Sequence, residues 1–202
     1  MAVLATGCAG TTYVGYRGEY RSGGYYDDTY QSYIIGVSSY YHVPEREVII
    51  IHDRGIAYDD LPVVYYLADR CNQSPDVIVD LRLGGMSWID IAWRFGVTAE
   101  VFYVPMREPV GPYRTTYSRF REAETGKNTW KSVRLRDADV VNQVNLQFIS
   151  KQYNQKPEEV AKVRAGKSNF VKVHDEVKKG KAKPAKPEKP KKEPRGRGRG
   201  GR

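Results

Sequence analysis

The side chains best suited to binding chemistry lie at the end of the chain, where cations dominate. Residues 178–202 contain eight Lys, four Arg and two Glu, a net charge of +10, whereas the whole chain carries +9. The other residues together are therefore close to neutral. Because cations that neutralise a polyanion release its counterions, we expect salt-sensitive binding to lipopolysaccharide, an acidic wall polymer or nucleic acid. The alternative is an extension that only solubilises the protein. The candidate polyanion-binding residues are Lys178, Lys179, Lys181, Lys183, Lys186, Lys189, Lys191, Lys192, Arg195, Arg197, Arg199 and Arg202.

Histidines and nucleophiles do not fall into patterns that indicate catalysis or metal binding. His42, His52 and His174 are scattered, with no pair at i, i+4 and no acid beside them in a metal motif. No Ser or Cys has sequence neighbours that would activate it as a nucleophile. We therefore predict a non-enzymatic protein without a metal or cofactor.

Two other patterns have a structural explanation. The acid pairs Asp59/Asp60 and Asp137/Asp139 are interpreted as helix caps rather than as acid–base partners. Residues 161–168, AKVRAGKS, formally fit a loose phosphate-loop pattern, but they lack a Gly-rich backbone and a preceding strand. Gly166 is better explained as a residue that ends a helix.

A cysteine near the start of the chain could carry a lipid. Residues 4–8, LATGC, resemble the end of a bacterial lipoprotein signal peptide, in which the final Cys is lipidated. The usual Leu three residues before the Cys is replaced by Ala5, and the apolar region is short, so we hypothesise a start codon upstream of Met1. The resemblance implies a membrane anchor at Cys8, and Ala9 directly after it favours the outer membrane. The alternative is an ordinary N-terminus that contains a cysteine.

The central part of the chain contains an internal repeat of twelve residues. Residues 67–78, LADRCNQSPDVI, align without a gap with residues 91–102, IAWRFGVTAEVF. Asn72 and Gly96 occupy the position where a helix ends in a residue of positive φ. Ser74 and Thr98 then follow as predicted N-caps of the next helix. Each unit is therefore predicted to form the corner of an αα-hairpin.

Weaker copies of the unit flank the clear pair. Residues 37–48 place His42 at the turn position, and residues 149–160 place Asn154 there. Four corners predict an all-α fold built from repeated αα-hairpins with helix-turn-helix-like corners. The alternative is that unrelated αα-corners share the same local chemistry. Residues 48–51 are one Val and three Ile, all β-branched, so a strand is an alternative to a helix there.

Composition divides the chain into six segments. The spacer is rich in Gly and Tyr, and the Pro-rich basic tail is predicted to be disordered and extended. Cys71 is expected to be a core thiol, and a disulfide with Cys8 is disfavoured because it would tie the spacer to the core. The segments are a possible signal end at 1–8, the spacer at 9–28, a helical repeat domain at 29–105, a connector at 106–131, a helical hairpin at 132–175 and the tail at 176–202.

Residues 88–102 resemble two known motifs over a short stretch. WIDIAWRFGVTAEVF is similar to helix-turn-helix DNA-binding domains and to peptidoglycan-binding LysM modules. A recognition helix needs Arg, Lys, Asn or Gln toward the groove, but residues 99–104 offer Glu100 and apolar side chains. LysM requires flanking strands, for which the sequence has poor candidates. The wider run, VPEREVIII, LGGMSWIDI and VFYVP, is similar to uncharacterised bacterial proteins of the envelope lipoprotein type.

Two functions of different class fit these observations. The favoured hypothesis is an envelope lipoprotein with a helical interaction module, anchored in the membrane through Cys8, whose tail binds polyanions. The alternative is an intracellular, cytoplasmic nucleic-acid-binding protein that uses the basic tail and the helix-turn-helix-like corners. The near-neutral body argues against the alternative, because a folded DNA-binding face normally carries its own basic patch.

Overall fold

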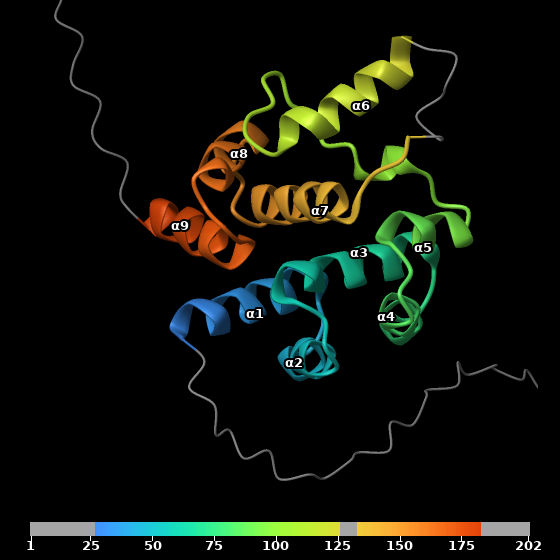
Figure 1. Cartoon of the computed structure of the whole chain (residues 1–202). Helices are drawn as coiled ribbons and strands as arrows, with labels where there is room; N and C mark the ends of the chain where they lie inside the picture. Colours follow the sequence, from blue (N-terminus) through green and yellow to red (C-terminus); the bar gives the residue numbers. More distant parts are fainter. Residues whose placement is uncertain (1–26, 126–132, 183–202) are drawn as a thin grey trace, which may run out of the picture.

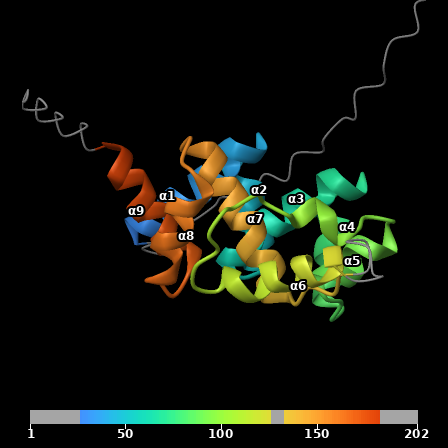
Figure 2. The ribbon, with the colours of Figure 1, turned by 90° about the horizontal axis from the view of Figure 1, so that it is seen from above.

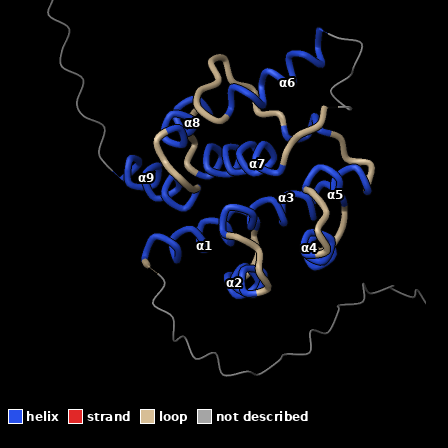
Figure 3. Tube along the Cα trace, viewed as in Figure 1, coloured by secondary structure: helices blue, strands red, loops and turns tan. Residues whose placement is uncertain are grey.

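The computed structural model describes residues 27–125 and 133–182, and every regular element in these two ranges is helical (Figures 1 and 3). The predicted all-α fold class is confirmed for these residues. The α-helices are α1 Asp28–Tyr41, α2 Glu45–Asp53, α3 Leu61–Cys71, α4 Pro75–Leu83, α5 Trp88–Arg94, α6 Tyr113–Thr125, α7 Asp137–Gln152, α8 Pro157–Ala165 and α9 Phe170–Ala182, with the short 3₁₀ helices η1 Tyr58–Asp60 and η2 Ala99–Phe102.

The four predicted turn residues all adopt the left-handed conformation. Their φ values are 56° at His42, 52° at Asn72, 75° at Gly96 and 47° at Asn154. At each turn the next residue donates its N–H to the carbonyl five positions earlier, which closes the helix end as in a Schellman motif. These bonds are Val43 to Ser38 at 3.1 Å, Gln73 to Ala68 at 3.0 Å, Val97 to Ala92 at 2.9 Å and Gln155 to Ser150 at 2.9 Å.

The helix starts follow the predicted capping chemistry in part. Ser74 accepts from the N–H of Val77 at the start of α4, as predicted. Thr98 makes no cap bond, and the segment after it is the 3₁₀ helix η2. The strand alternative for residues 48–51 is wrong, because they lie within α2 with Val48 and Ile51 buried three residues apart on one face.

The core forms where α3 and α7 pack against each other (Figures 1 and 2). The two predicted apolar faces meet there. α1 lies beside α9, and α8 packs on α7. The buried side chains of the two central faces include Leu61, Val64 and Leu67 from α3 and Val140, Val144 and Phe148 from α7.

The segment predicted as a connector contains a helix. α6 lies inside residues 106–131 and packs on α7 through Tyr113, Tyr117 and Phe120, all of which are buried. These residues repeat at i, i+4 and i+7, the spacing of one helical face. Arg and Thr residues between them lower the mean hydropathy and conceal that pattern in the sequence.

The last helix extends further than the sequence indicated. Order was expected to fade after His174, but α9 continues to Ala182 and therefore includes the first residues assigned to the tail. Val173 and Val177 are buried and continue the face that begins at Phe170. The rest of the predicted tail, the predicted signal end and residues 9–26 of the spacer lie outside the described residues. Asp27 caps α1 by accepting the N–H of Thr29.

Candidate functional site

Of the predicted polyanion-binding residues, the structure describes only the first three in the chain, Lys178, Lys179 and Lys181. Lys178 and Lys179 are exposed on the last turns of α9, and Lys181 follows on the same helix. The Lys178 ammonium donates to the hydroxyl of Ser32 at 2.8 Å. Lys179 forms an ion pair with Asp175 at 2.7 Å. The nine cations from Lys183 to Arg202, like Cys8, lie outside the described residues.

The two ends of the body lie side by side. α1 and α9 run antiparallel, since Ser32 contacts Lys178 and Gly36 contacts the ring of His174 (Figure 1). Hydrogen bonding and charge attraction from Asp175, with a further contribution from Asp27, raise the pKa of Lys179. The segment that leads back to Cys8 and the basic segment beyond Ala182 therefore leave the body at the same end.

Three of the four acids predicted to cap their own helices make tertiary contacts instead. Asp59 accepts the N–H of Phe170, the first residue of α9, at 2.9 Å. Asp137 accepts the N–H of Trp88, the first residue of α5, at 2.8 Å. The prediction of local caps is therefore wrong for both, because each carboxylate caps a helix distant in the sequence.

The other two acids, Asp60 and Asp139, differ from each other in their contacts. Asp60 makes no cap bond and instead accepts from the indole N–H of Trp88 at 3.4 Å. Asp139 takes part in a capping box with Arg136, and its prediction as a cap is confirmed. Burial raises the pKa of the Asp60 carboxyl, as it does for Asp59. Burial also acts on Asp139, but hydrogen bonds from Arg136 and Thr116 lower its pKa below the usual value.

His174 is part of the core. Its side chain is fully buried, and its Nε2 lies 2.7 Å from the hydroxyl of Tyr153. Burial lowers the pKa of His174 to about 4, with a further contribution from Lys178, so the ring is neutral near pH 7. The other two histidines lie elsewhere, His42 at its predicted turn and His52 against the carbonyl of Ile56. Within residues 27–125 and 133–182, no three His, Cys, Asp or Glu side chains gather to hold a metal ion.

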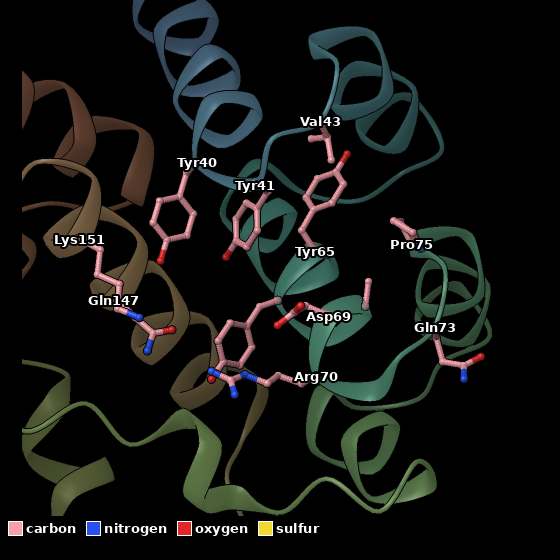
Figure 4. Close-up of a pocket in the computed structure, with 12 residues that line it drawn as sticks. Tyr40, Tyr41, Val43, Tyr65, Asp69, Arg70, Gln73, Pro75, Gln147 and Lys151 are labelled. Carbon is pink, nitrogen blue, oxygen red and sulfur yellow. The ribbon is translucent and has the colours of Figure 1, made fainter. Parts of the chain in front are cut away.

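A cavity of about 490 Å³ opens between the α1–α2 corner, α3 and α7. We call it the tyrosine pocket (Figure 4). Its walls include two pairs of adjacent tyrosines, Tyr40 with Tyr41 and Tyr65 with Tyr66. Arg70 and Lys151 stand on opposite sides of it, and Gln147 supplies an amide. Its lining is Tyr40, Tyr41, Val43, Tyr65, Tyr66, Ala68, Asp69, Arg70, Gln73, Pro75, Gln147 and Lys151.

The tyrosine rings are held by one another and by α7. Tyr41 stacks on Tyr65 with ring centroids 5.5 Å apart, and Tyr40 contacts Phe148 edge-on at 5.1 Å. The guanidinium of Arg70 lies 5.3 Å from the centroid of the Tyr66 ring, a cation–π geometry. Packed rings of this kind keep their orientation without a ligand, so the pocket is preformed.

The pocket was not predicted from the sequence. The signal that was available is the repetition of Tyr-Tyr shortly before two of the predicted corners, at residues 40–41 and 65–66. Because neighbouring helical residues point in different directions, such a pair does not by itself predict a shared cavity. Gln147 and Lys151 come from a helix more than 70 residues later, and only the fold brings them to the tyrosines.

Cys71 lies in the core of the body. It is a buried free thiol, as expected for a core residue, and burial raises its pKa. In the described part of the chain no helix combines the length and apolarity needed to cross a bilayer. Searches of protein-family models, curated proteins and solved structures find no match to this chain.

Proposed function

We propose that the protein is a non-enzymatic lipoprotein of the bacterial cell envelope, anchored through Cys8, whose basic segment binds polyanions. The observation that carries this proposal is the pairing of α1 with α9, the first and last helices of the described body. A membrane anchor at Cys8 and the cations after Ala182 would act at the same end of the helical body. A near-neutral body between them would interact little with the polyanion.

The lengths of the two segments are compatible with this arrangement. Nineteen residues separate Cys8 from Asp28, and the cations from Lys183 to Arg202 lie within twenty residues of Ala182. At roughly 3.3–3.6 Å per extended residue, neither segment can span more than about 70 Å. The cations can therefore reach no further from the end of the body than about the distance that the spacer can cover between the body and the membrane. Anionic groups at or near the anchoring membrane, such as lipopolysaccharide phosphates or an acidic wall polymer, lie within that reach.

We also propose that the body is a set of repeated helical hairpins that serves as an interaction module. The support is the shared geometry of the four corners, which have positive φ at His42, Asn72, Gly96 and Asn154 and the same N–H to carbonyl bond. Two further turns with positive φ, at Gly55 and Gly85, separate α2 from η1 and α4 from α5. A helical hairpin cannot bury its apolar face alone and has to pack against other units.

Cell fractionation tests the anchor. The protein expressed from its native gene should enter the membrane fraction, and mass spectrometry should find a lipid on the peptide that contains Cys8. Cys8→Ala should release the protein, whereas Cys71→Ala, which removes the buried thiol, should leave it in the membrane. A soluble wild type with unmodified Cys8 contradicts the proposal and makes the intracellular nucleic-acid-binding function the next to test.

Salt-dependent binding tests the basic segment. The affinity of the full chain for lipopolysaccharide and for teichoic-acid-type polymers should fall steeply as salt rises, because binding releases counterions. Replacing Lys183, Lys186 and Lys189 with Gln should make the slope of log affinity against log salt concentration shallower by about two to three, taking the roughly 0.9 per cation that holds for duplex DNA. A matched set on the body, Lys156, Lys162 and Lys172 to Gln, should leave the slope unchanged. Equal effects of the two sets would contradict the proposal.

A further inference from the structure

We infer that the tyrosine pocket is a binding site for a small ring compound that carries a carboxylate or phosphate, such as a uronic acid or a sugar phosphate. The site is separate from the basic segment and does not depend on the proposed envelope function. The pocket offers two cations, three tyrosine hydroxyls that make no hydrogen bond among the described residues, and aromatic walls.

The charge of the pocket favours an anion. Arg70 from α3 and Lys151 from α7 line it on opposite sides (Figure 4). Neither forms an ion pair with an acid among the described residues, whereas Arg54, Arg82 and Arg119 elsewhere on the body do. Asp69 is the only acid in the lining, and it is exposed like Arg70 and Lys151, so the charged side chains around the pocket sum to +1. Two cations that have no acid partner and face one space attract an anion more strongly than isolated surface cations do.

The hydroxyls of Tyr40 and Tyr41 add donors for such an anion. Figure 4 shows both pointing into the space bounded by Gln147 and Arg70. Neither hydroxyl forms a hydrogen bond with the described part of the chain, in contrast to Tyr66, whose hydroxyl donates to the carbonyl of Val101. Burial raises the pKa of Tyr40 and of Tyr41, so both remain O–H donors near pH 7. Hydrogen bonds to an ionised acceptor are the stronger kind.

A buried hydroxyl in the lining also lacks a partner. Tyr65 is 4% exposed, and its hydroxyl has no hydrogen bond among the described residues. In Figure 4 it points toward Val43, at the other end of the pocket from Arg70. Since buried polar groups are nearly always hydrogen-bonded in folded proteins, such a group indicates a place for a polar ligand atom. A ligand with hydroxyls as well as an anionic group would satisfy both ends.

The size and walls of the pocket limit the ligand to one or two rings. A cavity of about 490 Å³ lies within the range of small-molecule sites. Tyr40, Tyr41 and Tyr66 present aromatic rings to it, which favour a flat or ring-shaped ligand over an extended chain. An acidic glycan unit or a sugar phosphate has the required ring, hydroxyls and charge.

The test is a set of ligand-observed NMR titrations of the full chain at physiological salt. The probes are glucuronic acid, glucose 1-phosphate, neutral glucose and the acidic dipeptide acetyl-Asp-Ala. The wild type should bind at least one of the two anionic sugars more tightly than glucose. The better of the two identifies the source of the anion, an acidic glycan or a sugar phosphate.

Substitutions then locate the binding. Arg70→Met should weaken binding of the anionic sugar about tenfold or more, because a charge-assisted hydrogen bond is lost. Tyr40→Phe removes only a hydroxyl from a partly exposed ring and should weaken binding by a smaller factor. Arg94→Met is the matched control, since Arg94 is exposed at the equivalent position of the next predicted corner and lies outside the pocket. It should have no effect.

Several results would overturn the inference. They are no binding of either anionic sugar, equal binding of glucose, tighter binding of the acidic dipeptide, or equal losses in Arg70→Met and Arg94→Met. Every protein in the series keeps the same basic segment, so failure here is distinct from failure of polyanion binding. Circular dichroism melting curves confirm that each variant is folded before it is titrated.

Discussion

The carboxylate of Asp59 accepts a hydrogen bond from the backbone N–H of Phe170, which lies 2.9 Å away and 111 residues later in the chain. The bond places an acid at the first turn of α9, where unpaired N–H groups and the helix dipole favour a negative charge. It therefore fixes where α9 begins on the body. Because α9 carries Lys178 and Lys179, the same bond helps to position the start of the basic segment.

Loss of this tertiary cap should destabilise the fold. We expect Asp59→Ala to lower the free energy of unfolding by about 1–2 kcal/mol, the usual cost of removing a helix cap. Asp59→Asn keeps an acceptor and should cost less. Urea denaturation gives both values. Asp28→Ala, at an exposed first-turn position of α1, is the control, and an equal effect there would contradict the role given to Asp59.

Acid should destabilise the protein through His174. Its pKa is about 4 in the folded state, below the ordinary value of 6.5, so the unfolded chain binds more protons between these values. Stability therefore rises with pH across that window and falls as pH drops from about 6.5 toward 4. The full shift in pKa corresponds to at most about 3–4 kcal/mol. His174→Gln should flatten the pH profile of unfolding, and His42→Asn, at an exposed turn, should leave it unchanged.

The contact between α1 and α9 should not tolerate a methyl group at Gly36. A Cβ there would lie 2.4 Å from Nε2 of His174. Overpacking of this kind typically costs about 1–3 kcal/mol, and we expect Gly36→Ala to fall in that range. Gly180→Ala on α9 is the matched control, since a Cβ there meets nothing within 4 Å. It should be neutral or slightly stabilising. Melting temperatures would measure the difference, and similar values for both variants would refute it.

The stability of the corners should depend on how easily the turn residue adopts positive φ rather than on contacts of its side chain. Asn72→Ala is expected to cost about 1 kcal/mol, because residues other than Gly and Asn adopt positive φ with strain. Asn72→Gly should be close to neutral. Gly96→Ala should cost a similar amount, since a Cβ at Gly96 meets nothing within 4 Å and only the backbone is strained. Thermal unfolding of the three variants checks this, and a harmless Gly96→Ala would contradict it.

The sequence was informative where the chemistry is local. A helical corner, in which a turn residue is followed two positions later by a helix start, is encoded within a dozen residues. Asn72 and Gly96 could therefore be predicted as turn residues of positive φ, and His42 and Asn154 could be predicted by alignment with them. The amphipathic faces of α3 and α7 could also be predicted, because their apolar residues repeat at helical spacing.

Contacts between distant segments could not be predicted. Asp59 and Asp137 have the composition of local caps, and only the packed fold shows that each caps another helix. α6 was missed because the large side chains of its buried face are two tyrosines and one phenylalanine, which lie among charged and polar residues. The tyrosine pocket needs Gln147 and Lys151 opposite Tyr40, an arrangement that no spacing within α1 or α7 alone implies.

The antiparallel pairing of α1 with α9 also decides how the protein would respond to mechanical load. If the membrane holds the N-terminal segment and a polymer holds the C-terminal one, the pulling force acts on two neighbouring helix ends. The helices would then separate like a zipper, from Ser32 and Lys178 toward Gly36 and His174. Contacts would break in succession rather than together, which lowers the force at which the pair opens. Opening of the pair as far as Gly36 and His174 would also load the core, because Tyr33 of α1 and His174 of α9 pack against Phe148 of α7.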